Sequence, residues 1–211
     1  GFDLFGRTIY LYGVMAALGF ILGMLYCTKR AKKFGLQEDN IYDVILWALP
    51  MAIVGARAYY VIFNFDLYRG RPLMDMIAIW EGGLAIYGGI IAGALTLYIY
   101  CRLQKKDWRR ALDMVAPGVM IAQAMGRWGN FFNGEAYGGI VPEKSLLYFL
   151  RMGLDPNDLT HGMAYVHPTF LYESLWNILG FVLINVFLYK RKKFNGQIFL
   201  TYAAWYGFGR M

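Results

Sequence analysis

Long apolar stretches that end at short basic clusters constrain this sequence more than any other feature. An apolar stretch of about 20 residues is long enough to cross the hydrocarbon of a bilayer as a helix. Basic residues gather in the cytoplasmic loops of membrane proteins. We therefore expect an integral membrane protein whose basic clusters face the cytoplasm. Of its 21 lysines and arginines, thirteen lie in three clusters: Lys29, Arg30, Lys32 and Lys33; Arg102, Lys105, Lys106, Arg109 and Arg110; and Lys190, Arg191, Lys192 and Lys193.

The composition supports this reading. Of the 211 residues 58% are hydrophobic, and the mean hydropathy is +0.38, which is typical of membrane proteins rather than soluble domains. The net charge of +7 lies mainly at the ends of apolar segments. It therefore indicates topology and contact with anionic lipids rather than binding to nucleic acid, for which no module is visible.

The pattern predicts an all-α, polytopic membrane helix bundle with six spans. We expect one integral membrane domain over 1–211, with 134–166 as a small extracytoplasmic cap that is too polar to span. The amino terminus is expected outside, because the positive charges follow the first apolar run. The expected spans are about 8–28, 41–65, from the 80–89 segment to 101, 111–132, from 167 to the basic cluster at 190–193, and 197–211.

Local signals add three expectations. Pro50 should kink the second span, and a short interfacial helix is expected over Leu73–Trp80. Gly89 and Gly93 form a GxxxG pair, for which close helix packing is the default explanation.

A polar motif follows the fourth apolar run. Residues 126–139 read Gly-Arg-Trp-Gly-Asn-Phe-Phe-Asn-Gly-Glu-Ala-Tyr-Gly-Gly. An arginine at the centre of a membrane helix costs roughly 2.5–3.5 kcal/mol on insertion scales. If the motif is helical, Arg127, Asn130 and Gly134 share one face, and the glycines allow close approach of lipid or of another helix. The motif indicates a preorganised polar site at the membrane surface.

Residues 126–138 resemble the signature of the prolipoprotein diacylglyceryl transferase family. That signature is Gly-Arg-x-Gly-Asn-Phe-x-Asn-x-Glu-x-x-Gly, and every fixed position is filled here. The resemblance extends to Tyr12-Gly13, to the His-Pro-x-x-x-Tyr-Glu element at 167–173 and to the Tyr-Gly-x-x-Arg motif that ends at Arg210. Tyr87 stands where the family has a histidine considered a catalytic base. The family continues past Arg210 into further charged residues and a last helix, so we expect a seventh span.

The resemblance implies a bacterial transferase of the cytoplasmic membrane. It would move the diacylglyceryl group of phosphatidylglycerol onto the lipobox cysteine thiol in the signal peptide of a preprolipoprotein, releasing glycerol phosphate. This is the first step of lipoprotein modification. The active site is expected toward the extracytoplasmic face. The partners are then the two substrates and the lipid bilayer, with no nucleic acid, and no cofactor or metal is expected.

Roles for individual residues follow from the resemblance. Arg127 and Arg210 would stabilise the phosphate as it leaves, since guanidinium binds phosphate in bidentate fashion. The group that takes the thiol proton stays open between Tyr87, Glu135 and Glu173. The expected substrate-binding residues are Tyr12, Arg57, Arg127, Asn130, Asn133, Glu135, Gly138, Glu173 and Tyr206.

Two charged residues need partners inside the membrane. Arg57 is expected to meet a carboxylate or a lipid phosphate, and Glu173 an arginine such as Arg57 or Arg127. The two histidines, His161 and His167, do not have a metal-ligand spacing, and His167 is expected in a loop before Pro168.

Two other classes of function fit part of the pattern. A transporter or flippase for an anionic solute could use the same arginines, but it predicts inverted repeats and a site at the midplane. A non-catalytic membrane scaffold would not need a coordinated set of arginine, asparagine and glutamate.

Overall fold

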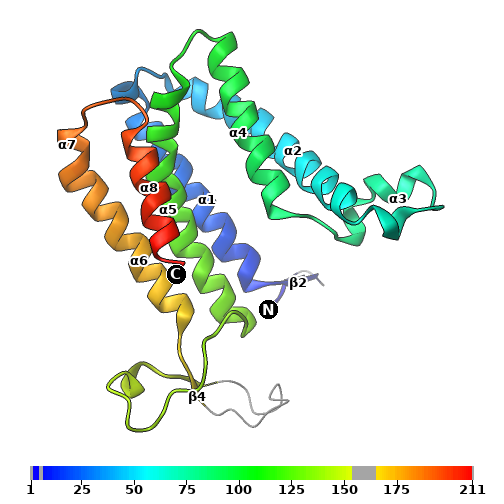
Figure 1. Ribbon diagram of the computed structural model, residues 1–211, viewed down its shortest axis with the longest axis vertical. Helices are drawn as coiled ribbons and strands as arrows, with labels where there is room; N and C mark the ends of the chain where they lie inside the picture. Colours follow the sequence, from blue (N-terminus) through cyan, green and yellow to red (C-terminus); the bar gives the residue numbers. More distant parts are fainter. Residues whose placement is uncertain (1, 5–6, 154–164, 211) are drawn as a thin grey trace. The chain divides into compact units, whose positions relative to one another are not determined.

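The computed structural model describes residues 2–4, 7–153 and 165–210. They divide into two compact units, of which the first holds Gly1–Cys27 and Asp113–Met211 and the second holds Thr28–Leu112 (Figure 1). Each unit is described by itself. The expected single membrane domain, with 134–166 as its cap, remains a prediction.

The first unit is a helix bundle with two small pairs of strands. Strand β1 pairs antiparallel with β2, and β3 with β4. Helix α5 belongs to this unit from Asp113 onward. The elements are β1 (Phe2–Leu4), β2 (Arg7–Ile9), α1 (Leu11–Arg30), α5 (Trp108–Asn133), the 3-10 helix η4 (Tyr148–Leu150), β3 (Met152–Gly153), β4 (Tyr165–Val166), α6 (Thr169–Leu183), the π-helix η6 (Ile184–Leu188), α7 (Tyr189–Arg191) and α8 (Gln197–Phe208).

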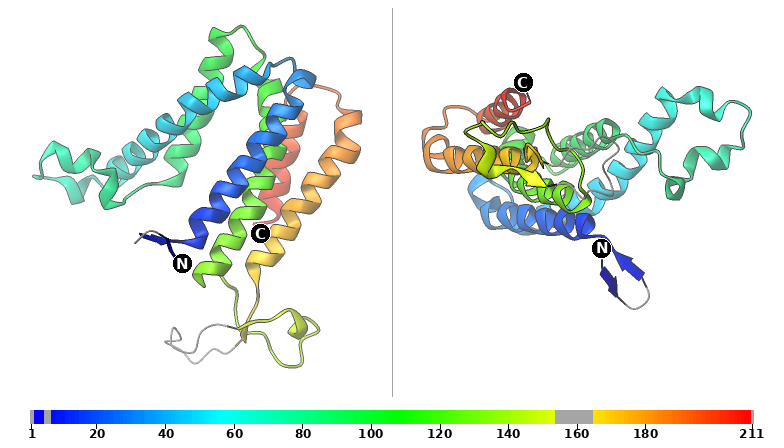
Figure 2. Two further views of the ribbon diagram at one scale, coloured as in Figure 1. Left: turned by 180° about the vertical axis from the view of Figure 1, so that it is seen from behind. Right: turned by 90° about the horizontal axis from the view of Figure 1, so that it is seen from below.

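Helix α5 forms the centre of this unit, and α1 packs closely along it (Figure 2). A Cβ atom added to Gly19 would lie 2.9 Å from the carbonyl oxygen of Ala122. One added to Gly23 would lie 2.8 Å from that of Gly118. Gly19 and Gly23 therefore form a GxxxG pair that brings two backbones together, as small residues do in membrane bundles. This pair was not predicted from the sequence.

Hydrogen bonds join α6 and α8 to α5. The Ser174 hydroxyl donates to the carbonyl of Ala124 over 3.1 Å. At the other end of α5, the fully buried Asp113 accepts the backbone N–H groups of Gly196 (2.8 Å) and Phe199 (3.0 Å). Its carboxylate also lies 2.8 Å from Lys192 Nζ. A carboxylate at a helix start satisfies free N–H groups and suits the helix dipole, so Asp113 anchors the first turn of α8.

The second unit is built on the paired helices α2 and α4. At their crossing, a Cβ atom on Gly55 would lie 2.7 Å from the carbonyl oxygen of Gly88. Gly89 makes only ordinary contact, and no described atom lies within 4 Å of a Cβ on Gly93. The prediction that Gly89 and Gly93 carry the close packing was wrong, because Gly88 makes the close approach to α2 instead. The elements of this unit are the 3-10 helix η1 (Ala31–Phe34), α2 (Glu38–Phe63), the 3-10 helix η2 (Phe65–Tyr68), α3 (Leu73–Ile77), the 3-10 helix η3 (Ile79–Glu81) and α4 (Ile86–Leu103).

The expected all-α membrane helix bundle is confirmed, and the chain is a multi-pass membrane protein. Of the described residues, four stretches are long and apolar enough to cross a membrane: Leu11–Phe34, Glu38–Phe63, Ile86–Leu103 and Thr169–Arg191. The other two expected spans are helical as well. Helix α5 has 26 residues but is more polar, and α8 has 12. Helices α3 and η3 cover the expected short helix near 73–80, and α2 continues through Pro50.

Candidate active site

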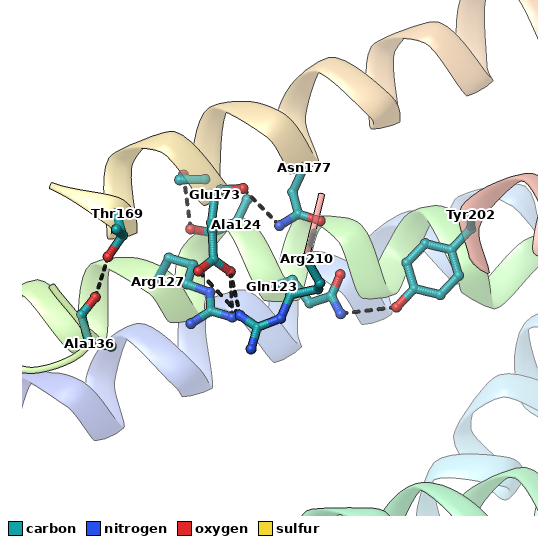
Figure 3. Close-up of polar contacts among 10 residues, drawn as sticks. Gln123, Ala124, Arg127, Ala136, Thr169, Glu173, Asn177, Tyr202 and Arg210 are labelled. Carbon is teal, nitrogen blue, oxygen red and sulfur yellow. Dashed lines mark hydrogen bonds and ion pairs between the residues drawn. The ribbon is translucent and has the colours of Figure 1, made fainter. Parts of the chain in front are cut away.

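Three charged side chains meet where α5, α6 and α8 come together (Figure 3). Arg127 Nη2 lies 2.6 Å from Glu173 Oε2, and Arg210 Nη1 lies 3.4 Å from both oxygens of the same carboxylate. The side chains of Arg127 and Glu173 are each 25% exposed, and that of Arg210 is 54% exposed. The expected pairing of Glu173 with Arg127 is confirmed.

The helices that carry these residues explain their meeting. Arg127 lies near the end of α5, and Glu173 lies in the second turn of α6, which begins just after Pro168. The Asn177 side chain donates to the carbonyl of Glu173 over 2.9 Å. Arg210 lies two residues past the end of α8 and stands in a turn rather than in the helix, contrary to our expectation. Its side chain is more exposed than that of Arg127.

The second half of the motif leaves the helix. Helix α5 ends at Asn133, and Gly134 adopts a positive φ of 64° that favours glycine. The expectation that Gly134 shares a helical face with Arg127 was therefore wrong. The chain turns back at this point, so that Glu135 Oε1 accepts the side-chain amides of Asn130 (3.3 Å) and Asn133 (3.2 Å). In the described contacts Glu135 orients these amides, whereas Glu173 pairs with the arginines.

The segment after the motif is tied to the start of α6. The backbone N–H of Gly138 donates to the carbonyl of His167 over 2.9 Å, and His167 N–H donates to Gly139 over 3.0 Å. A Cβ atom on Gly138 would lie 2.9 Å from the Cβ of His167, so this approach needs glycine. The Thr169 hydroxyl donates to the carbonyl of Ala136 (Figure 3). His167 is a loop residue as predicted, with Nδ1 3.2 Å from the Tyr172 hydroxyl, while His161 lies outside the described residues.

Tyr12 and Tyr206 lie on the helices around this cluster. The Tyr12 ring packs on Gly129 of the motif, where an added Cβ would lie 2.8 Å from its Cδ2. Tyr206 stands on α8 one turn before Arg210 and contacts the ring of Tyr202 at a centroid distance of 6.2 Å. The structure therefore brings Tyr12 against the motif and places Tyr206 on the helix that leads to Arg210.

Arg57 belongs to the second unit and has a different environment from the one expected. It is 5% exposed and donates to four backbone carbonyls: Met76 (2.9 Å), Asp75 (2.6 Å), Gly82 (2.5 Å) and Gly83 (3.1 Å). Among the described residues its partners are backbone oxygens of the loop that contains α3 and η3, and not the carboxylate that we expected. These oxygens offset the cost of burying the guanidinium, and a lipid phosphate as a further partner remains a prediction. Arg57 fixes this loop onto α2.

Tyr87, the residue at the family's histidine position, also lies in the second unit. It stands in the first turn of α4, is 67% exposed, and has its ring 6.4 Å from that of Tyr59. Its side chain is accessible to a ligand, and its catalytic role remains a prediction.

A second polar contact, which was not predicted from the sequence, lies one helical turn from Arg127. Gln123 Nε2 lies 3.0 Å from the hydroxyl of Tyr202 (Figure 3), while Gln123 Oε1 is buried with no partner among the described residues. The spacing of four residues from Gln123 to Arg127 places both on one face of α5 and was the signal available in the sequence.

The fold and the cluster define a multi-pass helical membrane protein with two guanidinium groups gathered at one end of its bundle. Comparison with known proteins then gives its family. The model of the prolipoprotein diacylglyceryl transferase family matches residues 1–211. A phosphatidylglycerol–prolipoprotein diacylglyceryl transferase of Limosilactobacillus reuteri (strain DSM 20016) is 43% identical over 204 residues, covering 96% of this chain and 74% of the relative.

A second relative of the same name, from Streptococcus pyogenes serotype M5 (strain Manfredo), is 48% identical over 204 residues, covering 96% of this chain and 77% of the relative. The chain belongs to the prolipoprotein diacylglyceryl transferase family, and the family resemblance carried by residues 126–138 is confirmed. The protein is a transferase of the membrane.

Proposed function

We propose that this protein transfers the diacylglyceryl group of phosphatidylglycerol to the cysteine thiol of a prolipoprotein, and that Arg127 and Arg210 bind the phosphate of the lipid. The names of the relatives carry the reaction. The cluster of Arg127, Arg210 and Glu173 supports the proposed site, because two guanidinium groups share a single carboxylate. One positive charge is left uncompensated in this cluster, and it matches the single negative charge of a phosphodiester.

The two arginines are suited to different roles in binding the lipid phosphate. Arg127 is held over 2.6 Å by Glu173 and is already oriented. Arg210 is more exposed and its contacts with Glu173 are longer, so it can turn onto an incoming phosphate at lower cost. Guanidinium binds phosphate through paired, charge-assisted hydrogen bonds. Fixed donors placed where charge develops lower the barrier to departure of the leaving group.

In the proposed reaction the thiol sulfur of the lipobox cysteine attacks the glyceryl carbon that carries the phosphate. A carbon–sulfur bond forms and the carbon–oxygen bond breaks, so that glycerol phosphate leaves with the bonding electron pair. The thiol proton passes to a base. Both oxygens of Glu173 already accept contacts from arginine, whereas both described contacts of Glu135 are made through Oε1. Among the three candidates we therefore favour Glu135 over Glu173, with Tyr87 as the alternative.

The remaining site residues are placed to contact the lipid and its glycerol headgroup. We propose that Asn130 and Asn133, oriented by Glu135, face the glycerol hydroxyls, and that Tyr12 and Tyr206 border the lipid. Gly138 allows the segment after the motif to close against the start of α6.

The orientation in the membrane follows from the charges at the two ends of α6. Glu173 lies near its start, and the basic cluster that begins at Lys190 lies at the far end of η6 and α7. The 17 residue steps from Glu173 to Lys190 span roughly 25 Å at about 1.5 Å per residue, close to the roughly 30 Å of hydrocarbon in a bilayer. Since basic clusters face the cytoplasm, we propose that Arg127, Glu173 and Arg210 lie toward the extracytoplasmic face of the cytoplasmic membrane and that the amino terminus is outside.

The test is direct transfer in vesicles. The protein is reconstituted with phosphatidylglycerol and incubated with a lipobox peptide, and the peptide mass is measured. The proposal predicts a gain of one diacylglyceryl unit that disappears when the lipobox cysteine is replaced by serine. A peptide that keeps its mass while the lipid crosses the bilayer would indicate a flippase instead.

A further inference from the structure

A reciprocal pair of tryptophans joins α6 to α8. Trp176 Nε1 donates to the carbonyl oxygen of Trp205, and Trp205 Nε1 donates to that of Trp176, each over 3.1 Å. The two indole rings are stacked with centroids 4.1 Å apart and an angle of 12° between their planes. Aromatic pairs more often lie about 4.5–7 Å apart in offset or edge-on arrangements. The two hydrogen bonds therefore hold the rings in a closer, nearly parallel contact.

Glycines make room for both rings. Gly180 of α6 faces the indole of Trp205, and Gly209 faces the indole of Trp176. A Cβ atom on Gly209 would lie 3.2 Å from Cε2 of Trp176 and closer still to its Nε1. Gly209 immediately precedes Arg210, so the Trp176 ring lies directly against the backbone that carries this guanidinium.

The pair is close to the charged cluster along both helices. Trp176 follows Glu173 by three residues on α6, and Trp205 precedes Arg210 by five residues. The end of α8 meets the start of α6, so a slip of α8 by one residue would move Arg210 by about 1.5 Å and turn it by roughly 100°. Such a slip would break the 3.4 Å contacts of Arg210 with Glu173. The reciprocal bonds oppose this slip, because both would be lost together.

We propose that Trp176 and Trp205 are positioning residues, whose paired indoles hold Arg210 in register with Glu173 and thereby present it to the phosphate of the lipid. This inference rests on the proposed role of Arg210. The tryptophans act through that guanidinium and not by contact with the substrate.

The first variant is Trp205→Phe, which keeps an aromatic ring and removes the N–H donor. It is expected to lower kcat/KM for phosphatidylglycerol about tenfold, the effect of one lost hydrogen bond on an oriented group. Gly209→Ala, which presses a methyl group on Trp176, should give a similar loss. The matched control is Thr201→Val on the same helix, since the Thr201 hydroxyl donates within α8 to Gln197 over 2.9 Å and not to α6. The control should transfer at the wild-type rate.

A spectroscopic measurement reports on the pair itself. Stacked indoles couple electronically, and the resulting exciton signal in circular dichroism should be lost in Trp205→Phe and kept in Thr201→Val. If Trp205→Phe loses this signal and still transfers at the wild-type rate, the inference is overturned.

A double-mutant cycle separates positioning of Arg210 from a general structural role. In an Arg210→Lys background, Trp205→Phe should lower kcat/KM by less than about twofold, because the group that it positions is already changed. The same tenfold loss in both backgrounds would overturn the inference. An Arg210→Lys protein as active as the wild type would instead overturn the proposed role of Arg210, so the two failures are distinguishable.

Discussion

Glu173 should be coupled much more strongly to Arg127 than to Arg210, although both arginines share its carboxylate. The first pair is short, at 2.6 Å, and both side chains are 25% exposed. A short charge-assisted hydrogen bond of this kind is worth about 1.5–3 kcal/mol. The second pair is 3.4 Å long and its arginine is 54% exposed, so solvent and salt should reduce its contribution to below about 1 kcal/mol.

The perturbations are Glu173→Gln, Arg127→Gln and Arg210→Gln, singly and in the two pairs that contain Glu173→Gln. With about 2–4 °C of Tm per kcal/mol for a chain of 150–250 residues, loss of the pair worth about 1.5–3 kcal/mol means that Glu173→Gln should lower the apparent Tm by roughly 3–12 °C. Each pair is compared with its single variants in one detergent at one scan rate, because membrane proteins often unfold irreversibly and their Tm then depends on the rate. Glu143→Gln, at an exposed position outside the helices, is the control for loss of a carboxylate.

The expected result is a coupling for Arg127 at least twice that for Arg210, with the latter vanishing at high salt. Equal couplings, or a larger coupling for Arg210, would refute the reasoning that Arg127 is the fixed guanidinium and Arg210 the adaptable one. The assignment of their separate roles in phosphate binding would then fail as well.

Three further variants test the packing that supports the site. Gly88→Ala should lower the free energy of unfolding by about 1–3 kcal/mol, because the added methyl group overpacks the crossing with Gly55. Gly93→Ala should not lower it, because no described atom lies within 4 Å of the added methyl group. Thermal unfolding of the two variants measures the difference, and equal losses would contradict the prediction. Arg57→Ala leaves four backbone carbonyls without the guanidinium and should lower the free energy of unfolding by at least about 3 kcal/mol. Arg69→Ala, at an exposed position, is the control and should not lower it. Equal Tm values for the two variants would contradict this prediction. Asp113→Asn should cost about 2–3 kcal/mol and increase amide hydrogen exchange at the start of α8. The two carboxylate oxygens each accept a different backbone N–H, and the variant turns one of them into an NH2 group that cannot accept. Unchanged exchange there would show that this end is held by other contacts.

The helices were predictable from the sequence because hydrophobic length and basic ends are local properties. All six expected segments contain helices, and α3 lies where a short helix was expected. The pairing of Glu173 with Arg127 was predictable for a similar reason, since a carboxylate placed inside a membrane helix needs a cation.

The predictions that were wrong concern contacts between segments that are distant in the sequence. The sequence contains several glycine pairs with GxxxG spacing, and nothing local distinguishes Gly89 and Gly93 from Gly19 and Gly23, which approach α5 closely. Arg57 was expected to find a charged partner, but a loop more than 15 residues further along the chain supplies backbone oxygens instead. The tryptophan pair was equally hidden, because its bonds run from side chain to backbone between two helices.

At the end of the motif the prediction from helical spacing failed for a different reason. Helical spacing placed Gly134 on the face of Arg127, yet the chain leaves the helix at that glycine and its φ is positive. A glycine after an apolar helix is itself a common stop signal, and it competes with the helical reading of the motif. The amides that Glu135 orients are a consequence of this turn.

The most direct test of the account is a structure of the protein with a non-reactive phosphatidylglycerol analogue bound. The quantity to measure is the distance from the phosphate oxygens to the guanidinium nitrogens of Arg127 and Arg210. We expect both arginines to donate to the same phosphate over about 2.7–2.9 Å, with Arg210 turned away from Glu173. A phosphate seated elsewhere, with both arginines still paired to Glu173, would contradict it.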